Sequence, residues 1–190
     1  MALFAALIAI SGFLIIPLPG GIPIVLKNLF IVLSGTVLGG FYGFIAVLIF
    51  LCAGLLGLPV FVIPGGPGVF LTPLGGYIIG YCFASLAAGL ISGIPSQKAS
   101  GDSKIALAKY YLRVSAASLA GFSLILLCGA LYLIPLNSLS LKAALIAGTL
   151  PFIPVDLIKL AISIPLAIKL RPIAARYINP MGGEKGTPHA

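Results

Sequence analysis

The sequence contains very little charge. Only 7% of its 190 residues are Asp, Glu, Lys or Arg, whereas ordinary soluble domains carry about 25%. So few charged side chains cannot cover the surface of a soluble fold. The hydrophobic fraction is 61% and the mean hydropathy is +1.24. A lipid bilayer is therefore expected to surround most of the chain, which predicts an all-α integral membrane protein.

Groups that perform chemistry are also scarce. The only acidic residues are Asp102, Asp156 and Glu184, and the only histidine is His189 near the C-terminus. No phosphate-binding loop of the form Gly-x-x-x-x-Gly-Lys-Ser/Thr occurs in the sequence, which argues against ATP hydrolysis by this chain. Zinc chemistry and general acid–base catalysis would need clustered His or acidic residues. We therefore expect neither an enzyme nor a bound cofactor.

Six apolar segments approach the length of about 20 residues that a helix needs to cross a bilayer. They are residues 2–16, 24–38, 41–56, 74–94, 111–134 and 154–170. They leave room for short loops only, so residues 1–190 are expected to form a single transmembrane domain. Residues 171–190 are polar and Gly-rich and are expected to form a mobile tail. The N-terminus has no charged region or cleavage motif of a signal peptide, so the first helix is expected to be retained.

Two connections are irregular. Residues 57–76 are apolar but dense in Gly and Pro, which no continuous helix tolerates. Because lipid cannot hydrogen-bond to exposed backbone, this loop must cover the protein surface or line an interior cavity. Residues 135–154 form the second irregular region, with a short helix expected over 141–147.

The distribution of basic residues predicts the orientation. The net charge is +8, and most Lys and Arg residues lie in the connection after residue 94 and in the C-terminal region after residue 168. With six spans, these two regions fall on the same side, so both termini are expected to be cytoplasmic. The Gly/Pro-rich loop then lies outside the cell. Because the charges lie between membrane spans, nucleic acid is not an expected partner.

Asp156 is the only acidic residue near membrane depth. Lys159 follows it by three residues, so both side chains share one face of a helix. Ionisable groups inside a membrane are costly and usually have functions, which predicts a ligand site. A structural ion pair that holds the last span in place is the alternative.

Three further residues are candidates for the same site. Lys27 begins the second span, where it contacts a ligand or extends its ammonium group to the membrane interface. Tyr77 and Tyr81 lie one helical turn apart, where they wall a pocket or belong to the aromatic belt of a membrane protein.

Small residues recur at helical spacing. Ala2, Ala5, Ala6 and Ala9 form one stripe on the first span, which permits close approach of another helix, either within the protein or from a partner. Glycine pairs spaced by four at 35/39, 76/80 and 89/93 are expected to pack internally.

Four segments resemble the BioY family, the biotin-binding S components of energy-coupling-factor (ECF) transporters. Gly57-Leu-Pro-Val-Phe61 followed by Gly65-Gly66-Pro67-Gly68 is the first. The others are Thr72-Pro-Leu-Gly-Gly-Tyr77, Pro151-Phe-Ile-Pro-Val-Asp-Leu-Ile-Lys159 and Ile22-Pro-Ile-Val-Leu-Lys27. Departures are Lys27 where the family usually has Gln, and Thr72 and Leu74 in place of Gly and Thr.

The resemblance implies an S-component-like helical bundle in the cell membrane that binds biotin near the outer surface. It assigns Asp156 and Lys159 to the ligand. Tyr77 is expected to pack against the bicycle of biotin, and Phe61 is a further candidate for substrate binding. It also implies that the Ala stripe docks onto the transmembrane coupling subunit of an energising module with two ATPase subunits. Three rival hypotheses remain at this point: an S component for another small vitamin, a membrane-embedded lipid-modifying enzyme, and a purely structural subunit.

Overall fold

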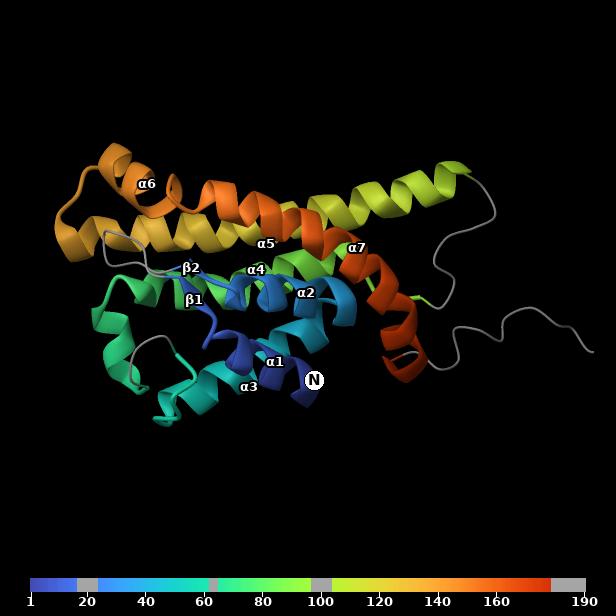
Figure 1. Ribbon diagram of the computed structural model, residues 1–190, viewed down its shortest axis with the longest axis horizontal. Coiled ribbons are helices and arrows are strands. Elements are labelled where there is room, and N and C mark those ends of the chain that lie inside the picture. Colours follow the sequence, from blue (N-terminus) through green and yellow to red (C-terminus); the bar gives the residue numbers. More distant parts are fainter. Residues whose placement is uncertain (17–23, 62–64, 97–103, 179–190) are drawn as a thin grey trace, which may run out of the picture.

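The computed structural model describes residues 1–16, 24–61, 65–96 and 104–178. The α-helices in these ranges are α1 (Ala2–Ser11), α2 (Lys27–Leu38), α3 (Gly40–Leu55), α4 (Leu74–Ser92), α5 (Lys104–Asn137), α6 (Leu141–Thr149) and α7 (Ile153–Ile178). They are joined by one 3₁₀ helix, η1 (Pro67–Leu71), and by two-residue antiparallel strands, β1 (Ile15–Ile16) and β2 (Ile24–Val25) (Figure 1). Apart from this short strand pair, the predicted all-α class is confirmed.

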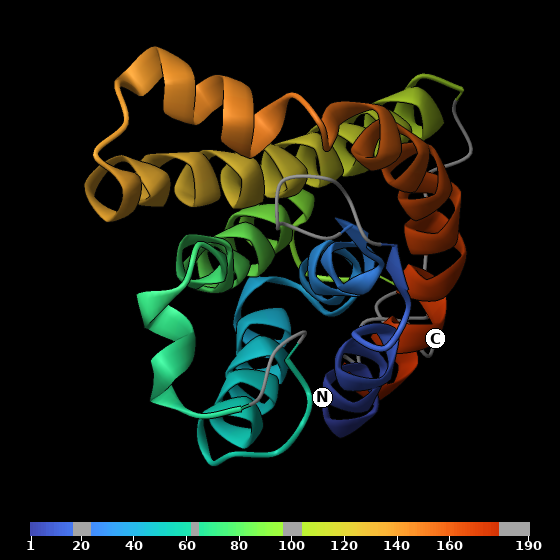
Figure 2. The same ribbon diagram turned by 60° about the vertical axis from the view of Figure 1, so that its left-hand side comes forward.

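Helix α2 lies at the centre of the bundle. It contacts α1, α3, α4, α5 and α7, and these helices surround it when the molecule is viewed nearly along its axis (Figure 2). Eleven of its twelve residues are buried. Helix α6 packs on α5 at the end of the molecule that also carries the strand pair and η1 (Figure 1). The opposite end carries the start of α5 and the end of α7.

Glycine makes the close packing of α2, α3 and α4 possible. A Cβ atom on Gly35 would lie 2.1 Å from the backbone oxygen of Ser85, and one on Gly89 would lie 2.3 Å from the backbone of Gly40. Any side chain at these two positions would therefore push the helices apart. The expectation that the spaced glycines pack internally is confirmed at both places.

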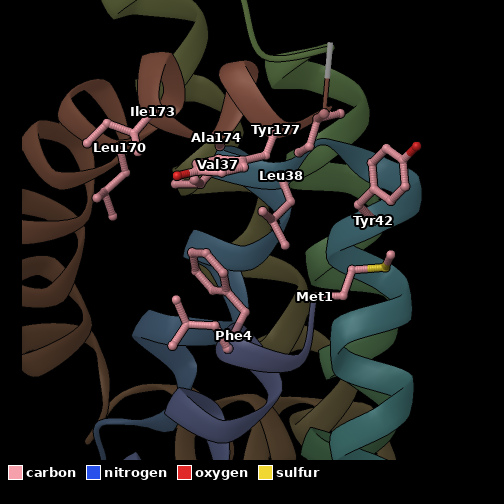
Figure 3. A pocket seen from close by; sticks show the side chains of 11 residues that line it. Met1, Phe4, Val37, Leu38, Tyr42, Leu170, Ile173, Ala174 and Tyr177 are labelled. Carbon is pink, nitrogen blue, oxygen red and sulfur yellow. The ribbon is translucent and has the colours of Figure 1, made fainter. Parts of the chain in front are cut away.

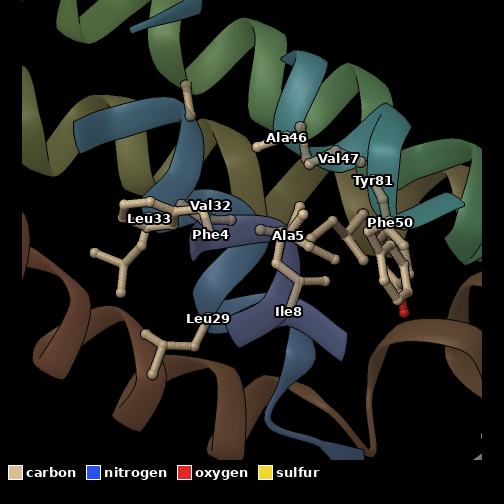
Figure 4. Close-up of a cluster of buried hydrophobic side chains, with 14 of the residues drawn as sticks. Phe4, Ala5, Ile8, Leu29, Val32, Leu33, Ala46, Val47, Phe50 and Tyr81 are labelled. Carbon is tan, nitrogen blue, oxygen red and sulfur yellow. The ribbon is translucent and has the colours of Figure 1, made fainter. Parts of the chain in front are cut away.

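Large apolar side chains cover the outside of the bundle. Every α-helix except the central α2 exposes at least one of them; Phe41 on α3 is 68% exposed and Leu112 on α5 is 71% exposed. The interior is equally apolar: side chains such as Ile8, Val32, Val47 and Phe50 form one cluster between α1, α2 and α3 (Figure 4). An apolar exterior around an apolar core is the arrangement expected of a membrane protein.

The six predicted spans are only partly confirmed as helices of membrane-crossing length. Helices α4 and α5 are long and apolar enough to cross alone, and α6 with α7 would make a third span with a 54° bend. Helices α1, α2 and α3 are apolar but have only 10, 12 and 16 residues. The first predicted span was too long: α1 ends at Ser11, because Ile15–Ile16 leaves the helix to pair with Ile24–Val25.

The last two long helices extend beyond their predicted ends. Helix α5 begins at Lys104 and continues through Pro135, and α7 continues through Pro165 and Pro172 to Ile178. The prediction of an irregular tail from residue 171 was therefore wrong for residues 171–178, because packing in the bundle tolerates proline inside these helices. Four segments lie outside the described residues. They are the predicted first loop around 17–23, residues 62–64, the polar connection around 97–103 and the tail from 179 onward.

Candidate functional site

Asp156 and Lys159 form a buried ion pair. They lie in the first turns of α7, and the Lys159 Nζ atom donates a hydrogen bond of 2.8 Å to Asp156 Oδ1. The two residues are only 5% and 4% exposed. The position of Asp156 near the N-terminus of α7 suits an anion, because the helix dipole is positive there. The spacing of three residues thus produces the contact that the sequence predicted.

The ion pair does not use all of its hydrogen-bonding capacity. Asp156 Oδ2 is buried and has no hydrogen-bond partner. A lysine ammonium group has three N–H donors, and the pairing with Oδ1 uses one of them. A buried polar atom without a partner costs about 1–3 kcal/mol, so an arrangement that leaves one open needs an explanation. A water molecule or a ligand that donates to Oδ2 would supply the missing hydrogen bond.

A small cavity lies beside Lys159. It is lined by residues from β2, α2, α4, α5, the α6–α7 junction and α7, namely Val25, Asn28, Leu74, Tyr77, Tyr81, Leu126, Phe152 and Lys159. Its volume is about 20 Å³, and a single water molecule needs roughly 10–15 Å³. The cavity therefore accommodates about one water molecule, and a larger ligand enters only if the lining side chains move apart.

The two predicted tyrosines line this cavity. Tyr77 donates a hydrogen bond of 2.7 Å to the Gly148 carbonyl of α6, and its ring meets Phe152 edge to face with centroids 6.0 Å apart. Tyr77 therefore connects α4 to α6 and forms an aromatic wall. Tyr81 is 6% exposed and lines the cavity, and no hydrogen bond of its hydroxyl is found among the described residues.

Asn28 also lines the cavity, and the sequence analysis missed it. Its side chain is 8% exposed, and its Oδ1 atom has no hydrogen-bond partner. Asn28 follows Lys27 in the first turn of α2. An amide inside an apolar run was the available signal, because burial of an unpaired amide is costly. The sequence alone did not reveal which neighbours this face of α2 would meet.

Lys27 and Phe61 lie in a different cluster. The Lys27 ammonium group is 2% exposed, donates a hydrogen bond of 2.7 Å to the Val60 carbonyl, and lies 4.8 Å and 5.7 Å from the ring centroids of Phe50 and Phe61. These two rings meet edge to face, and Figure 4 shows Phe50 within the core between α1 and α3. Neither Lys27 nor Phe61 lines the cavity beside Lys159. The structure therefore divides the predicted ligand residues into two sets.

A larger, apolar groove lies at the opposite end of the molecule. It has a volume of about 440 Å³ and lies between the beginnings of α1 and α3 and the ends of α2 and α7 (Figure 3). Phe4, Leu38, Tyr42 and Tyr177 are among its lining residues, and none of the lining side chains is charged. The groove is roomier than the cavity beside Lys159 but offers no partner for a charged or strongly polar ligand.

The predicted Ala stripe is only partly on the surface. Ala2 and Ala6 of α1 are exposed, and Ala9 is half-buried. Ala5 is 7% exposed and packs in the core, so it is not available to a partner. Phe4 on the same helix lines the apolar groove, but it is two residues from Ala2 and from Ala6, so the exposed alanines point to the other side of α1.

Comparison with known proteins agrees with this architecture. Residues 1–176 match the BioY family. The biotin transporter BioY of Thermotoga maritima is 32% identical over 170 residues, which cover 89% of this chain and 92% of that protein. The biotin transporter BioY of Rhodobacter capsulatus is 38% identical over 170 residues and 86% of each chain.

A solved structure is also similar. The crystal structure of the S-component for biotin from an ECF-type ABC transporter superposes with a TM-score of 0.76 at 34% identity. The match covers 90% of this chain and 87% of that one. The sequence match, the relatives and the shared helical arrangement lead to the same conclusion: this chain belongs to the BioY family.

Proposed function

We propose that this chain is the biotin-binding S component of an ECF-type importer and captures the vitamin at the outer side of the cell membrane. The observation that carries the proposal is the buried Asp156–Lys159 pair with an unpartnered carboxylate oxygen, beside a cavity lined by tyrosines. The names of the relatives and of the similar structure support biotin as the ligand. The protein itself catalyses no reaction.

The chemistry of the pair suits a cyclic urea. The ureido ring of biotin carries two N–H donors and one carbonyl acceptor. Asp156 Oδ2 has free lone pairs for an N–H group, and Lys159 has N–H donors left for the carbonyl. Charge-assisted hydrogen bonds in a water-poor site are the strong ones. Tyr77 and Phe152 supply apolar surface for the sulfur-containing bicycle.

Binding requires the cavity to widen. Its volume of about 20 Å³ is far below that of a vitamin. The aromatic contact between Tyr77 and Phe152 joins α4 to the α6–α7 junction, so a small separation of these elements enlarges the space beside Lys159. In this proposal the side chains that line the cavity move apart as biotin enters.

Removal of either charged partner tests the site. We expect Asp156→Asn and Lys159→Met each to raise the Kd for biotin, measured by titration calorimetry on detergent-purified protein. The loss of a hydrogen bond to a charged group, about 1.5–3 kcal/mol, corresponds to about tenfold to a hundredfold in Kd. Lys169→Met is the matched control, because it removes an exposed lysine from the same helix. Biotin affinity unchanged in both site variants would refute the proposed site.

Competition separates biotin from other vitamins. Desthiobiotin, which keeps the ureido ring but lacks the sulfur, is expected to compete with labelled biotin. Thiamine and riboflavin lack this cyclic urea and are expected not to compete. Stronger competition by one of them than by unlabelled biotin would make this chain an S component for that vitamin instead.

We further propose that six helices, α1 to α5 and α7, cross the membrane with both termini cytoplasmic. The exposed basic residues support this orientation. The start of α5 and the end of α7 lie opposite α6 (Figure 1), and these parts of the two helices carry Lys104, Lys109, Arg113, Lys169 and Arg176. Single cysteines at 109 and 142, in a background with the native cysteines replaced, test it in intact cells. A membrane-impermeant maleimide is expected to label Lys142→Cys on α6 and not Lys109→Cys. The reverse result would invert the topology.

We propose that the exposed alanines of α1 dock onto the coupling subunit of the energising module, which contains two ATPase subunits. Ala2 and Ala6 are exposed and four residues apart, so they allow a partner helix to approach this face of α1 closely. Ala6→Leu is expected to abolish co-purification with the module and biotin uptake while biotin binding persists. Ala116→Leu, on the exposed face of α5, is the matched control. Intact assembly of the Ala6→Leu variant would place the docking surface elsewhere.

A further inference from the structure

Asn28 and Lys27 are consecutive but point to different sides of the first turn of α2. Lys27 lies between Phe50 and Phe61 and has an acceptor in the Val60 carbonyl. Asn28 instead lines the cavity together with Tyr77, Tyr81 and Lys159. The two polar side chains therefore lie in separate parts of the protein. Of the two, Asn28 lines the cavity beside the ion pair and Lys27 does not.

Local structure does not explain Asn28. Asparagine near the start of a helix usually caps a backbone N–H group or bonds to a nearby carbonyl. Helix α2 has no side-chain cap hydrogen bond. Asn28 is only 8% exposed, yet its Oδ1 atom has no hydrogen-bond partner among the described residues. A buried amide without a partner is rare in native structures. Its position on the cavity wall indicates that the missing partner is a molecule that enters the cavity.

Asn28 adds an unpaired acceptor to the wall of the cavity that Lys159, the partner of Asp156, also lines. Asn28 Oδ1 and Asp156 Oδ2 are both buried acceptors without partners, and Lys159 has donors in reserve. Two acceptors and one donor are the complement of a cyclic urea, which presents two N–H groups and one carbonyl. We propose that Asn28 is a specificity-determining residue of this site, whose amide oxygen accepts a hydrogen bond from one of the two urea N–H groups of the ligand. This inference rests on the proposed function.

The key experiment replaces the amide with an apolar side chain that has the same number of heavy atoms. Asn28→Leu is expected to raise the Kd for biotin about tenfold, measured by titration calorimetry, because one urea N–H loses its acceptor on binding. The midpoint of thermal unfolding without ligand is expected to stay the same or to rise, because the variant removes a buried group that has no partner. A residue with a merely structural role would give the opposite combination, a lower midpoint with unchanged Kd.

Ser118→Ala is the matched control. Ser118 Oγ on α5 is also a buried side-chain oxygen without a partner, but Ser118 does not line the cavity. Its removal is expected to leave the Kd for biotin unchanged. If Ser118→Ala weakened binding as much as Asn28→Leu, the effect would not come from contact with the ligand, and the inference would fail.

A biotin analogue methylated on one ureido nitrogen identifies the contact. For one of the two nitrogens, methylation and Asn28→Leu are expected to weaken binding non-additively, because both remove the same hydrogen bond. Additive losses for both nitrogens would overturn the contact. If the unaltered protein binds biotin with the same Kd as Asn28→Leu, only this inference fails; if the unaltered protein does not bind biotin, the proposed function fails with it.

Discussion

The two ends of α7 carry buried charges of different kinds. Near its start, Asp156 and Lys159 pair with each other beside a cavity, and Asp156 Oδ2 has no partner. Toward its end lies Arg171, which is 3% exposed. Fifteen residues separate Asp156 from Arg171, which corresponds to about 22 Å along a helix. One helix thus contains two buried ionic sites that differ in how completely they are satisfied.

Arg171 is almost saturated by the protein itself. Its Nη1 atom donates to the Thr36 carbonyl of α2, and Nη2 donates to the carbonyls of Ser92, Gly93 and Ile94 at the end of α4. The C-terminal ends of helices carry unpaired carbonyls and partial negative charge, so a guanidinium group suits them. Its Nε atom has no hydrogen-bond partner, and the ring of Tyr110 lies 5.8 Å from the guanidinium carbon.

Under the proposed function, the difference separates a structural charge, Arg171, from a charged pair that recognises the ligand. Arg171 donates hydrogen bonds to backbone carbonyls of two helices. It lines neither the apolar groove nor the cavity beside Lys159. The Asp156–Lys159 pair keeps an acceptor and donors open beside a cavity. Burial alone therefore does not identify a ligand site. The proposed site rests in addition on unused hydrogen-bonding capacity next to a cavity.

The largest expected effect is on stability at the Arg171 end. Arg171→Met removes the donors for four carbonyls, and loss of a buried charged partner typically costs about 3–5 kcal/mol. Thermal unfolding followed by circular dichroism is expected to show a large decrease in the midpoint, with the Kd for biotin of the folded fraction unchanged. Arg176→Met, which removes an exposed arginine from the same helix, is expected to change neither quantity.

This comparison would be broken by one outcome in particular. If Arg171→Met unfolded at the same temperature as the unaltered protein but bound biotin more weakly, Arg171 would act on the ligand site from the far end of the helix. The distinction between a structural and a recognition charge would then not hold within α7.

A smaller effect is expected from the aromatic wall of the cavity. A Cβ atom on Gly129 of α5 would lie 2.2 Å from the ring of Tyr77, so Gly129→Ala must displace that ring. Overpacking of this kind costs about 1–3 kcal/mol, and we expect it to weaken biotin binding by about tenfold in calorimetry. Gly68→Ala is the control, because a Cβ atom there meets nothing within 4 Å. Normal affinity in Gly129→Ala would show that Tyr77 does not contact the ligand.

Local contacts of the fold and site were predictable from the sequence. The spacing of Asp156 and Lys159 places them on one helical face whatever the rest of the fold, and the ion pair is found. The short helix expected over 141–147 is also found, as α6. Both depend on residues close together in the chain, where helical geometry alone determines the contact.

Contacts between distant segments were not predictable in this way. Lys27 stays a predicted ligand residue, but the sequence did not indicate that the rings of Phe50 and Phe61, from α3 and the segment after it, would lie near its ammonium group. Ala5 belonged to the predicted docking stripe but faces the core. Asn28 was missed because only the tertiary structure shows which side of α2 meets the cavity. Helix periodicity indicates which residues share a face, not what that face meets.

The smallest effect is expected at Lys27, where the comparison can be sharpened. Like Arg171, Lys27 is buried and bonded to a backbone carbonyl, so it should behave as a structural charge. Lys27→Gln is expected to lower the free energy of unfolding by about 1 kcal/mol, because one hydrogen bond and the contacts with two aromatic rings are weakened. The Kd for biotin is expected to change by less than about twofold, since Lys27 does not line the cavity. A tenfold loss of affinity with unchanged stability would instead show that Lys27 belongs to the ligand site. Biotin would then have to extend from Asp156 past the first turn of α2.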